Sequence, residues 1–171
     1  MSAHELIHSS RSNEWYTPPR FIDSARAVMG DIDLDPASCV SANEVVKAHH
    51  FYSIDDDGLS RDWNGRVWMN PPYGRKWPPL FVRKALAEYQ RGNVSEAILL
   101  LNSNAVTNAW FKPLWDYPLC FAHGRVKFWG QSGKNSPTHG AVFVYLGVNS
   151  ERFKTEFAQH GPVVRRYEGA A

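Results

Sequence analysis

The chain has 171 residues, with 19 Lys and Arg against 17 Asp and Glu, which gives a formal net charge of +2. Hydrophobic residues make up 43% and charged residues 21%, a composition that is typical of a globular protein and excludes wholesale disorder. No apolar run reaches about 18 residues, so we expect neither a membrane span nor a signal peptide. Two cysteines, Cys39 and Cys120, are too few for a disulfide framework or a four-ligand zinc site. We therefore expect one soluble, intracellular domain over residues 1–171, with no metal ion.

The predicted helices begin near the N-terminus. Pro18 and Pro19 fit the first turn of a helix that ends at Gly30. Its apolar face consists of Phe21, Ile22, Ala25, Val28 and Met29. Further helices are expected over residues 41–47, 80–90 and 151–160, and over part of 107–115, where Pro113 should break the helix early.

Short apolar segments between these helices predict strands over residues 32–35, 67–69, 97–101, 126–129 and 141–146. The polar loop 130–140 would join the last two strands as a hairpin. Helices that alternate with buried strands and are followed by a hairpin predict an α/β three-layer sheet, mostly parallel, with a C-terminal antiparallel hairpin. In such sheets, ligands bind beyond the carboxyl ends of the strands.

The charge is unevenly distributed along the chain. Eight acids lie between Asp31 and Asp62, and only Lys47 and Arg61 offset them. No acid occurs between Tyr117 and Ser150. The pattern fits one site for a cationic or hydroxyl-rich ligand and another for an anionic ligand. It fits a charged surface without such a role equally well.

One strand runs directly into Asn70–Pro71–Pro72–Tyr73. Two consecutive prolines fix two φ angles, so this loop is rigid, while their carbonyl groups remain free to accept hydrogen bonds. Asn70 adds a side-chain acceptor and Tyr73 a flat ring. Together they predict a socket for a planar group that bears an NH2, such as the exocyclic amine of a nucleobase. The alternative is a tight turn with an Asn cap.

This motif resembles the signature of amino-methyltransferases that act on adenine N6. The segments EWYTPPRFI, DIDLDPAS, DGLSRDW and GRVWMNPPYG resemble the small phage-type DNA N6-adenine methyltransferases, the phage Dam family. AILLLNSN, GRVKFWG and THGAVFVYLG lie where that family has its later motifs. The resemblance covers roughly residues 13–146 and implies a Rossmann-like methyltransferase sheet, S-adenosylmethionine as methyl donor and double-stranded DNA as substrate.

The resemblance also implies a mechanism. The target adenine would be flipped out of the duplex. Asn70 Oδ1 and the Pro71 carbonyl would accept hydrogen bonds from its N6 amine, Pro72 would keep the loop rigid, and Tyr73 would stack on the ring. Catalysis would then consist mainly of positioning and electrostatics, without a general base before the transfer.

On the cofactor side, the stretch that begins at Asp33 resembles the first cofactor motif, in which an acid binds the cationic amino group. Residues 39–41 depart from the usual glycine-rich form, and an ordinary strand-to-turn connection remains an alternative. An aromatic segment near the N-terminus resembles the motif that closes over the methionine carboxylate, or else packs on the sheet. Among the three acids 55–57, Asp57 is our candidate for the ribose or the adenine, against a solvated loop. The cofactor candidates are Trp15, Tyr16, Thr17, Asp33, Asp35, Pro36, Ala37, Ser38 and Asp57.

On the nucleic-acid side, GRVKF resembles the motif whose aromatic ring, here Phe128, packs against the extruded base; a core Phe is the alternative. The basic, polar loop 130–140 suits phosphate contacts, or is a plain exposed loop. The candidate DNA contacts are Arg75, Lys76, Arg125, Lys127, Phe128, Lys134, Asn135 and His139.

Three other interpretations remain open: an RNA methyltransferase and a protein-glutamine methyltransferase, in which the same motif also occurs, and an inactive DNA-binding module of the same fold. About 35 residues separate the cofactor motif from Asn70, which leaves no room there for an inserted recognition domain. We therefore expect a short or relaxed target sequence, with a homodimer left open. The family usually marks phage DNA against host restriction, which implies the cytoplasm of the bacterial host.

Overall fold

The computed structural model describes residues 16–128 and 140–167. Within these residues the chain forms one seven-stranded sheet in the order β2-β1-β3-β4-β6-β5-β7. The strands are β1 (Leu34–Asp35), β2 (His50–Phe51), β3 (Gly65–Met69), β4 (Val94–Asn102), β5 (Leu119–Arg125), β6 (Gly140–Leu146) and β7 (Val163–Val164). The helices are α2 (Pro19–Met29), α3 (Val40–Val46), α4 (Trp77–Gln90) and α5 (Ser150–Phe157), with the 3-10 helices η1 (Ser103–Thr107) and η2 (Ala109–Asp116).

The sheet changes from parallel to antiparallel at β4. Strands β2, β1, β3 and β4 pair in parallel. The remaining neighbours, β4 with β6, β6 with β5 and β5 with β7, pair antiparallel. The α/β class is confirmed, whereas the expectation of a mostly parallel sheet holds only for the first four strands.

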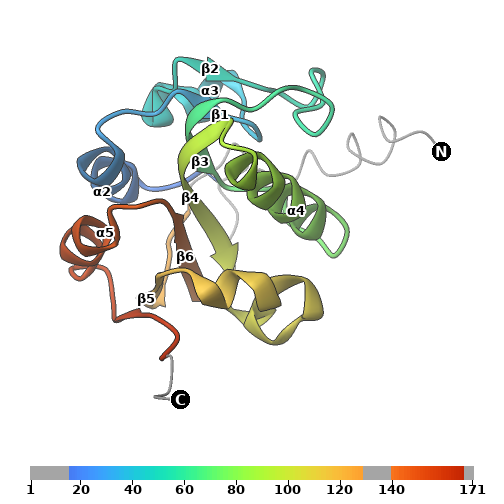
Figure 1. Cartoon of the computed structure of the whole chain (residues 1–171). Helices are drawn as coiled ribbons and strands as arrows, with labels where there is room; N and C mark the ends of the chain where they lie inside the picture. Colours follow the sequence, from blue (N-terminus) through green and yellow to red (C-terminus); the bar gives the residue numbers. More distant parts are fainter. Residues whose placement is uncertain (1–15, 129–139, 168–171) are drawn as a thin grey trace.

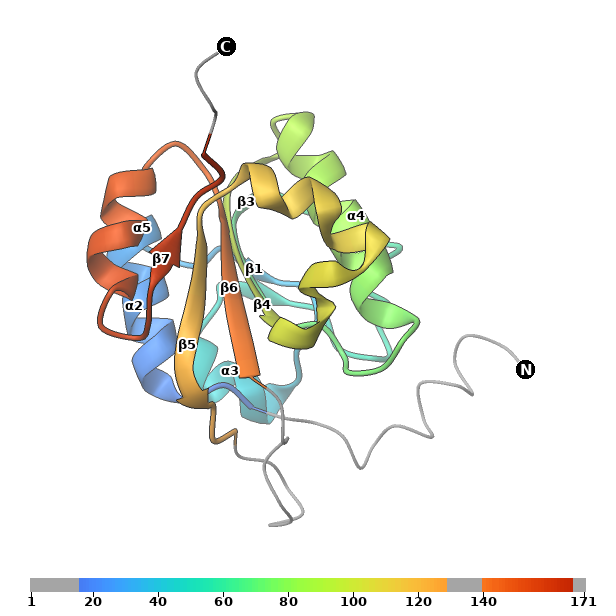
Figure 2. The same ribbon diagram turned by 90° about the horizontal axis from the view of Figure 1, so that it is seen from below.

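Helices cover both faces of the sheet, which gives three layers (Figures 1 and 2). Helices α2, α3 and α5 pack on one face, where Phe21, Trp68, Phe143 and Phe157 belong to the same core cluster. Helix α4 and η2 cover the other face, and their apolar side chains pack with Val67, Leu99 and Val144 in a second cluster. Strand side chains alternate between the two cores, because successive residues of a strand point to opposite faces.

Most predicted elements are present, with shifted ends. Helix α2 begins at Pro19 and ends before Gly30, whose φ of 84° is accessible to glycine without strain. Helix α4 begins at Trp77, three residues before the predicted start, because Pro78 and Pro79 fit its first turn. The segment 107–115 forms part of the 3-10 helices, and η2 continues past Pro113.

One predicted strand is wrong. Residues 126–128 are not in a strand; the partner of β6 is β5, which ends at Arg125. The predicted hairpin therefore exists, but its first strand lies earlier in the sequence. Pairing with β6 decides the strand here: Leu119 and Cys120 lie opposite Val144 and Phe143 and are fully buried, and a local apolar pattern does not reveal such a register.

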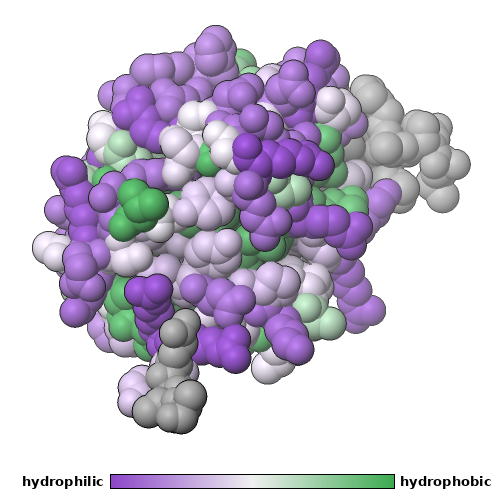
Figure 3. All heavy atoms as spheres, in the orientation of Figure 1, coloured by the Kyte–Doolittle hydropathy of each residue, from purple (hydrophilic) through white to green (hydrophobic). Residues whose placement is uncertain are grey.

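The surface seen in Figure 3 is mostly hydrophilic, with separate hydrophobic areas between charged and polar side chains. Among the described residues, no helix is both long and apolar enough to cross a membrane.

An ion pair ties β1 to β3 near the start of both strands. Arg66 Nε and Nη2 each donate to a different oxygen of Asp33, both at 2.8 Å. The Arg66 side-chain hydrogen bonds lower the pKa of Asp33 from 3.8 to about 2. Gly65 belongs to this arrangement, because a Cβ there would lie 2.5 Å from Asp33 Oδ2.

We expect Asp33→Asn to lower the free energy of unfolding at pH 7 by about 1 kcal/mol, since the pair is only partly shielded from water. A lowered pKa stabilises the fold above the unfolded value of 3.8, and this contribution is lost as the pH falls toward about 2. The difference between wild type and variant should therefore narrow between pH 5 and pH 3 in urea unfolding. Asp62→Asn, at an exposed position, is the control. An Asp33→Asn protein as stable as wild type at pH 7 would contradict the prediction.

Candidate active site

Two cavities lie beside the segment that follows β3. The first is lined by residues from the N-terminal segment, the β1–α3 turn, the loop after β2, β3 with its following loop, and α4. The second lies between that loop and the end of β4 with η1 and η2. Asn70, Pro71 and Tyr73 are the residues that line both cavities. The Asn-Pro-Pro-Tyr segment thus forms the boundary between the two cavities.

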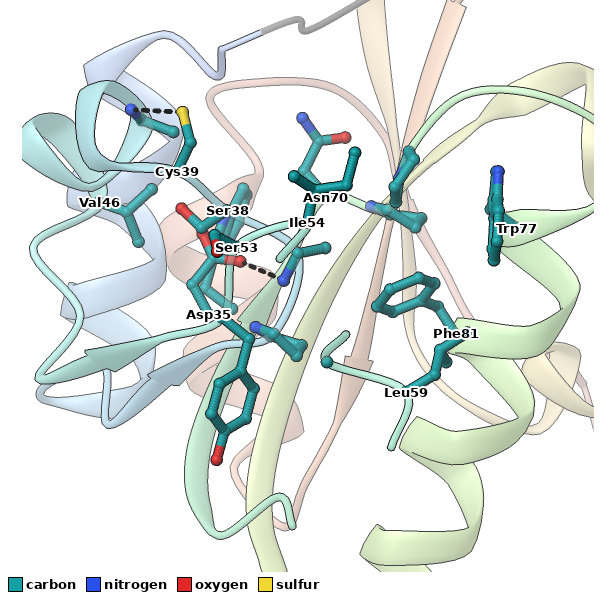
Figure 4. Close-up of a pocket in the computed structure, with 18 of the residues that line it drawn as sticks. Asp35, Ser38, Cys39, Val46, Ser53, Ile54, Leu59, Asn70, Trp77 and Phe81 are labelled. Atoms are coloured by element: carbon teal, nitrogen blue, oxygen red, sulfur yellow. Dashed lines mark hydrogen bonds between the residues drawn. The ribbon is translucent and has the colours of Figure 1, made fainter. Parts of the chain in front are cut away.

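Asp35 forms the buried polar part of the first cavity. It ends β1, its side chain lies beside Ser38 in Figure 4, and it is only 3% exposed. Burial raises the pKa of Asp35 to about 7, although the Ala37 N–H and the Ser38 side chain act in the opposite direction. Within the described residues, no cation forms a salt bridge with Asp35. A buried carboxyl of this kind is suited to a cationic ligand group.

Asn70 is oriented by a residue far away in the sequence. Its Nδ2 donates to Thr17 Oγ1 at 3.4 Å, which turns the amide oxygen away from Thr17. Thr17 and Tyr16 are both 5% exposed and line the first cavity. The Tyr16 hydroxyl accepts a hydrogen bond from Cys39 Sγ at 3.4 Å. The segment before α2 therefore lines the first cavity and contacts both Asn70 and Cys39.

The other part of the first cavity is apolar. Figure 4 shows Leu59, Trp77 and Phe81 on one side of Asn70 in this view, and Asp35 with Ser38 on the other. Tyr52 and Ile54, from the loop after β2, also line the cavity. Sequence reasoning missed these five residues. The apolar start of α4 and the position of Tyr52 and Ile54 just after a parallel strand are the signals that could have indicated them.

The predicted cofactor residues divide into three groups. The first cavity is lined by Tyr16, Thr17, Asp35, Pro36, Ala37, Ser38 and Asp57. Asp33 lines neither cavity, because its carboxylate is held by Arg66. Trp15 lies outside the described residues. Of the three neighbouring acids 55–57, Asp57 is the one that lines the first cavity. Its backbone has a φ of 52°.

The second cavity combines amides with aromatic rings. Asn102 at the end of β4, Asn104 in η1 and Asn108 between η1 and η2 line it. Trp110 and Tyr73 also line it. Amide groups and flat rings are the groups that proteins use to hydrogen-bond and stack nucleobases.

Tyr73 contacts Phe128, which lines neither cavity, is 7% exposed and belongs to the core cluster on the α2 face of the sheet. Their ring centroids are 6.1 Å apart with an interplanar angle of 81°, an edge-to-face contact. Burial raises the pKa of Tyr73, so its hydroxyl stays protonated. The structure thus brings together two residues, 55 positions apart, that the sequence assigned to the same base.

The predicted DNA contacts are more scattered. Arg75 lines the second cavity and is exposed, while Lys76 lies 4.6 Å from the centroid of the Trp77 ring. Arg125 and Lys127 are exposed near the end of β5. Lys134, Asn135 and His139 lie outside the described residues. In the described parts of the chain, no group of three or more His, Cys, Asp or Glu could hold a metal ion.

The mixed α/β sheet and its boundary motif are consistent with a methyltransferase-like fold. The DNA N-6-adenine-methyltransferase (Dam) family model matches residues 5–162. The chain therefore belongs to the Dam family, which confirms the resemblance. It is similar to a DNA N-6-adenine-methyltransferase of Escherichia phage T1, with 34% identity over 99 residues. That match covers 57% of this chain and 38% of the phage protein, so the chain spans well under half of that relative.

Asp35 predicts an unusual pH dependence of stability. Its pKa in the folded protein, about 7, is higher than the ordinary value of 3.8 for an aspartate. Between these values the folded state binds more protons than the unfolded state, so stability falls as the pH rises from about 4 to 7. Asp35→Asn should remove this loss and stabilise the ligand-free protein at pH 8, by at most about 4 kcal/mol.

Thermal unfolding of wild type and variant at pH 5 and pH 8 measures this effect. Asp57→Asn, at an exposed position on the same cavity, should show no gain at pH 8. An Asp35→Asn protein that is less stable than wild type at pH 8 would show that the carboxylate has a partner in the folded protein.

Proposed function

We propose that this protein transfers a methyl group from S-adenosylmethionine to the N6 amine of adenine in double-stranded DNA. Membership of the Dam family and the name of the phage T1 relative support this reaction. The observation that carries it is the pair of cavities whose shared lining is Asn70, Pro71 and Tyr73. A donor on one side and an acceptor amine on the other would meet at these residues.

The first cavity fits the cofactor. Its buried Asp35 carboxyl, which has no salt-bridge partner among the described residues, would bind the α-ammonium of the methionine part. Leu59, Trp77 and Phe81 provide an apolar surface for the flat adenine, and Asp57 is within the same lining for the ribose hydroxyls. When bound, S-adenosylmethionine supplies an electrophilic methyl group on a sulfonium.

The boundary segment would hold the acceptor amine. Thr17 binds the amide nitrogen of Asn70, which presents the Asn70 oxygen as an acceptor. The Pro71 carbonyl is a second acceptor in a turn made rigid by Pro72. Two hydrogen bonds accepted from N6 raise the electron density on that nitrogen and align its lone pair. The contribution of the protein is therefore orientation and electrostatics.

The target base would be flipped out of the duplex and held between aromatic rings. Unstacking is required of enzymes that act on base atoms. Tyr73 would stack on the base, with Phe128 against it, and the edge-to-face contact of these rings would open to admit the base. Exposed Arg75, Arg125 and Lys127 would contact phosphates, which gives affinity that depends on salt.

The remaining proposals follow from the same reading. Lys76 and loop residues Lys134, Asn135 and His139 would add phosphate contacts, and Trp15 would help to cover the cofactor. About 35 residues separate the cofactor motif from Asn70, which leaves few residues there to read bases, so the target sequence would be short or relaxed, and a homodimer would extend the contact with DNA. Such an enzyme would act in the cytoplasm of a bacterial host.

Transfer of labelled methyl from S-adenosylmethionine to unmethylated duplex DNA tests the function. Wild type should label N6-methyladenine, identified after digestion to nucleosides. Asn70→Ala should lose at least about 100-fold in kcat, because it removes an acceptor that acts on the reacting amine. Asn70→Asp keeps a side-chain acceptor and should retain more activity than Asn70→Ala.

Two other outcomes would contradict the proposed methylation of DNA. A wild-type protein that binds the cofactor but labels RNA or protein instead would replace the DNA substrate. The absence of both labelling and cofactor binding would leave a DNA-binding protein of this fold and overturn the proposal.

Thr17 offers a second test, of Asn70 orientation. Thr17→Val removes the hydroxyl acceptor and keeps a similar shape, so kcat should fall about tenfold, the value of one hydrogen bond. Thr17→Ser keeps the hydroxyl and should stay near wild type. Steady-state kinetics with duplex DNA, beside cofactor Kd values, separate this effect from lost cofactor binding. Equal losses in kcat for the Val and Ser variants would show that the hydroxyl has no orienting role.

A further inference from the structure

Trp68 is a fully buried tryptophan that lines the first cavity. It lies on β3, two residues before Asn70, and its side chain is 0% exposed. It belongs to the core cluster that includes residues of α2 and α5. The same residue borders the space in which the proposed cofactor would lie.

The Trp68 indole N–H lacks a hydrogen-bond partner among the described residues. Two other tryptophans, Trp63 and Trp115, differ in this respect. The equally buried Trp63 donates to the Gly58 carbonyl at 2.7 Å, and Trp115 donates to the Val106 carbonyl at 3.1 Å. Buried donors are nearly always paired, because an unpaired one loses its hydration without compensation. A donor left unpaired at the wall of a cavity points to a ligand atom that accepts from it.

The position of Trp68 in the sheet indicates which atom this is. Strands β1 and β3 are parallel neighbours, with Leu34 opposite Val67. The next residues along the two strands, Asp35 and Trp68, therefore lie side by side on the opposite face of the sheet. In an amino acid, the ammonium and the carboxylate are carried by the same carbon. If Asp35 holds the ammonium, the acceptor nearest to it is the carboxylate.

We propose that Trp68 Nε1 donates a hydrogen bond to the α-carboxylate of the cofactor, so that Asp35 and Trp68 together bind the zwitterionic end of its methionine part. This proposal rests on the proposed use of S-adenosylmethionine. It makes Trp68 a cofactor-binding residue, in addition to its role in the core.

Binding of two ligands to two proteins tests the proposal. S-adenosylhomocysteine carries both groups, whereas its decarboxylated analogue keeps the ammonium and the adenosine but lacks the carboxylate. Trp68→Phe removes the N–H and keeps an aromatic ring. We expect calorimetry to give a 10- to 100-fold weaker Kd for S-adenosylhomocysteine in Trp68→Phe, the range for a hydrogen bond to a charged group. The Kd of the analogue should change little.

Each control separates a different cause. Trp115→Phe loses an indole N–H that is bonded away from the cavity and should bind both ligands as wild type does. Equal weakening of both ligands in Trp68→Phe would assign the loss to packing and overturn the proposal, as would no weakening of either. If wild type binds neither ligand, the proposed cofactor itself fails, which is a distinct result.

A measurement on wild type protects the test if Trp68→Phe does not fold. In ¹⁵N-labelled protein, the indole N–H signal of Trp68 should move downfield when S-adenosylhomocysteine binds and should move less with the decarboxylated analogue. An indole signal that responds equally to the two ligands would contradict a bond to the carboxylate.

Discussion

The candidate active site depends on one topological constraint: from the parallel neighbours β1 and β3, the chain continues toward opposite edges of the sheet, to β2 after β1 and to β4 after β3. After β1 the chain crosses to α3 on one face of the sheet, whereas after β3 it crosses to α4 on the other face. The two connections diverge, so a crevice opens at the carboxyl ends of these neighbouring strands. The buried carboxyl at the end of β1 and the Asn-Pro-Pro-Tyr segment at the end of β3 border the same cavity for this reason. The prolines then keep the second connection rigid where it divides one cavity from the other.

Asp33, just before β1, and Asp35, at the end of β1, have different roles because they lie at different positions along the strand. Asp33 and Asp35 are two residues apart and so point to the same face of the sheet. Asp33 meets Arg66, which takes both of its oxygens, and it serves stability. Asp35 lies at the strand end, beyond the reach of that guanidinium, and is buried without a cationic partner among the described residues. Two positions that are close together on one strand segment thus carry a structural carboxylate, Asp33, and a carboxylate that suits a ligand, Asp35.

The sequence allowed the helices, the central strands and the boundary motif to be predicted, because periodicity, proline position and a short motif are local signals. It could not reveal contacts made by register. Pairing of β5 with β6 overrode the apolar pattern at residues 126–128. Trp77 and Phe81 line the first cavity because they lie in the first turns of α4, the helix that connects β3 to β4. Aromatic positions on a helix do not by themselves distinguish a cavity wall from a core.

Local contacts and burial decide which of the acidic and aromatic residues are available to bind a ligand. Many of the acids between Asp31 and Asp62 are engaged locally: Asp31 by Arg26 and His49, Asp33 by Arg66, and Asp56 by Ser53. Asp35 and Asp57 are the acids of that segment that line the first cavity. The acidic stretch therefore contributes two carboxyl groups to the candidate site. The aromatic residues divide in the same way. Trp63, Phe111, Phe143 and Phe153 are fully buried in the cores, whereas the partly exposed rings of Tyr73, Trp77 and Trp110 line the cavities. Trp68 belongs to both groups: its ring packs in the core, and its N–H, which has no partner among the described residues, is the part of it that can serve a ligand.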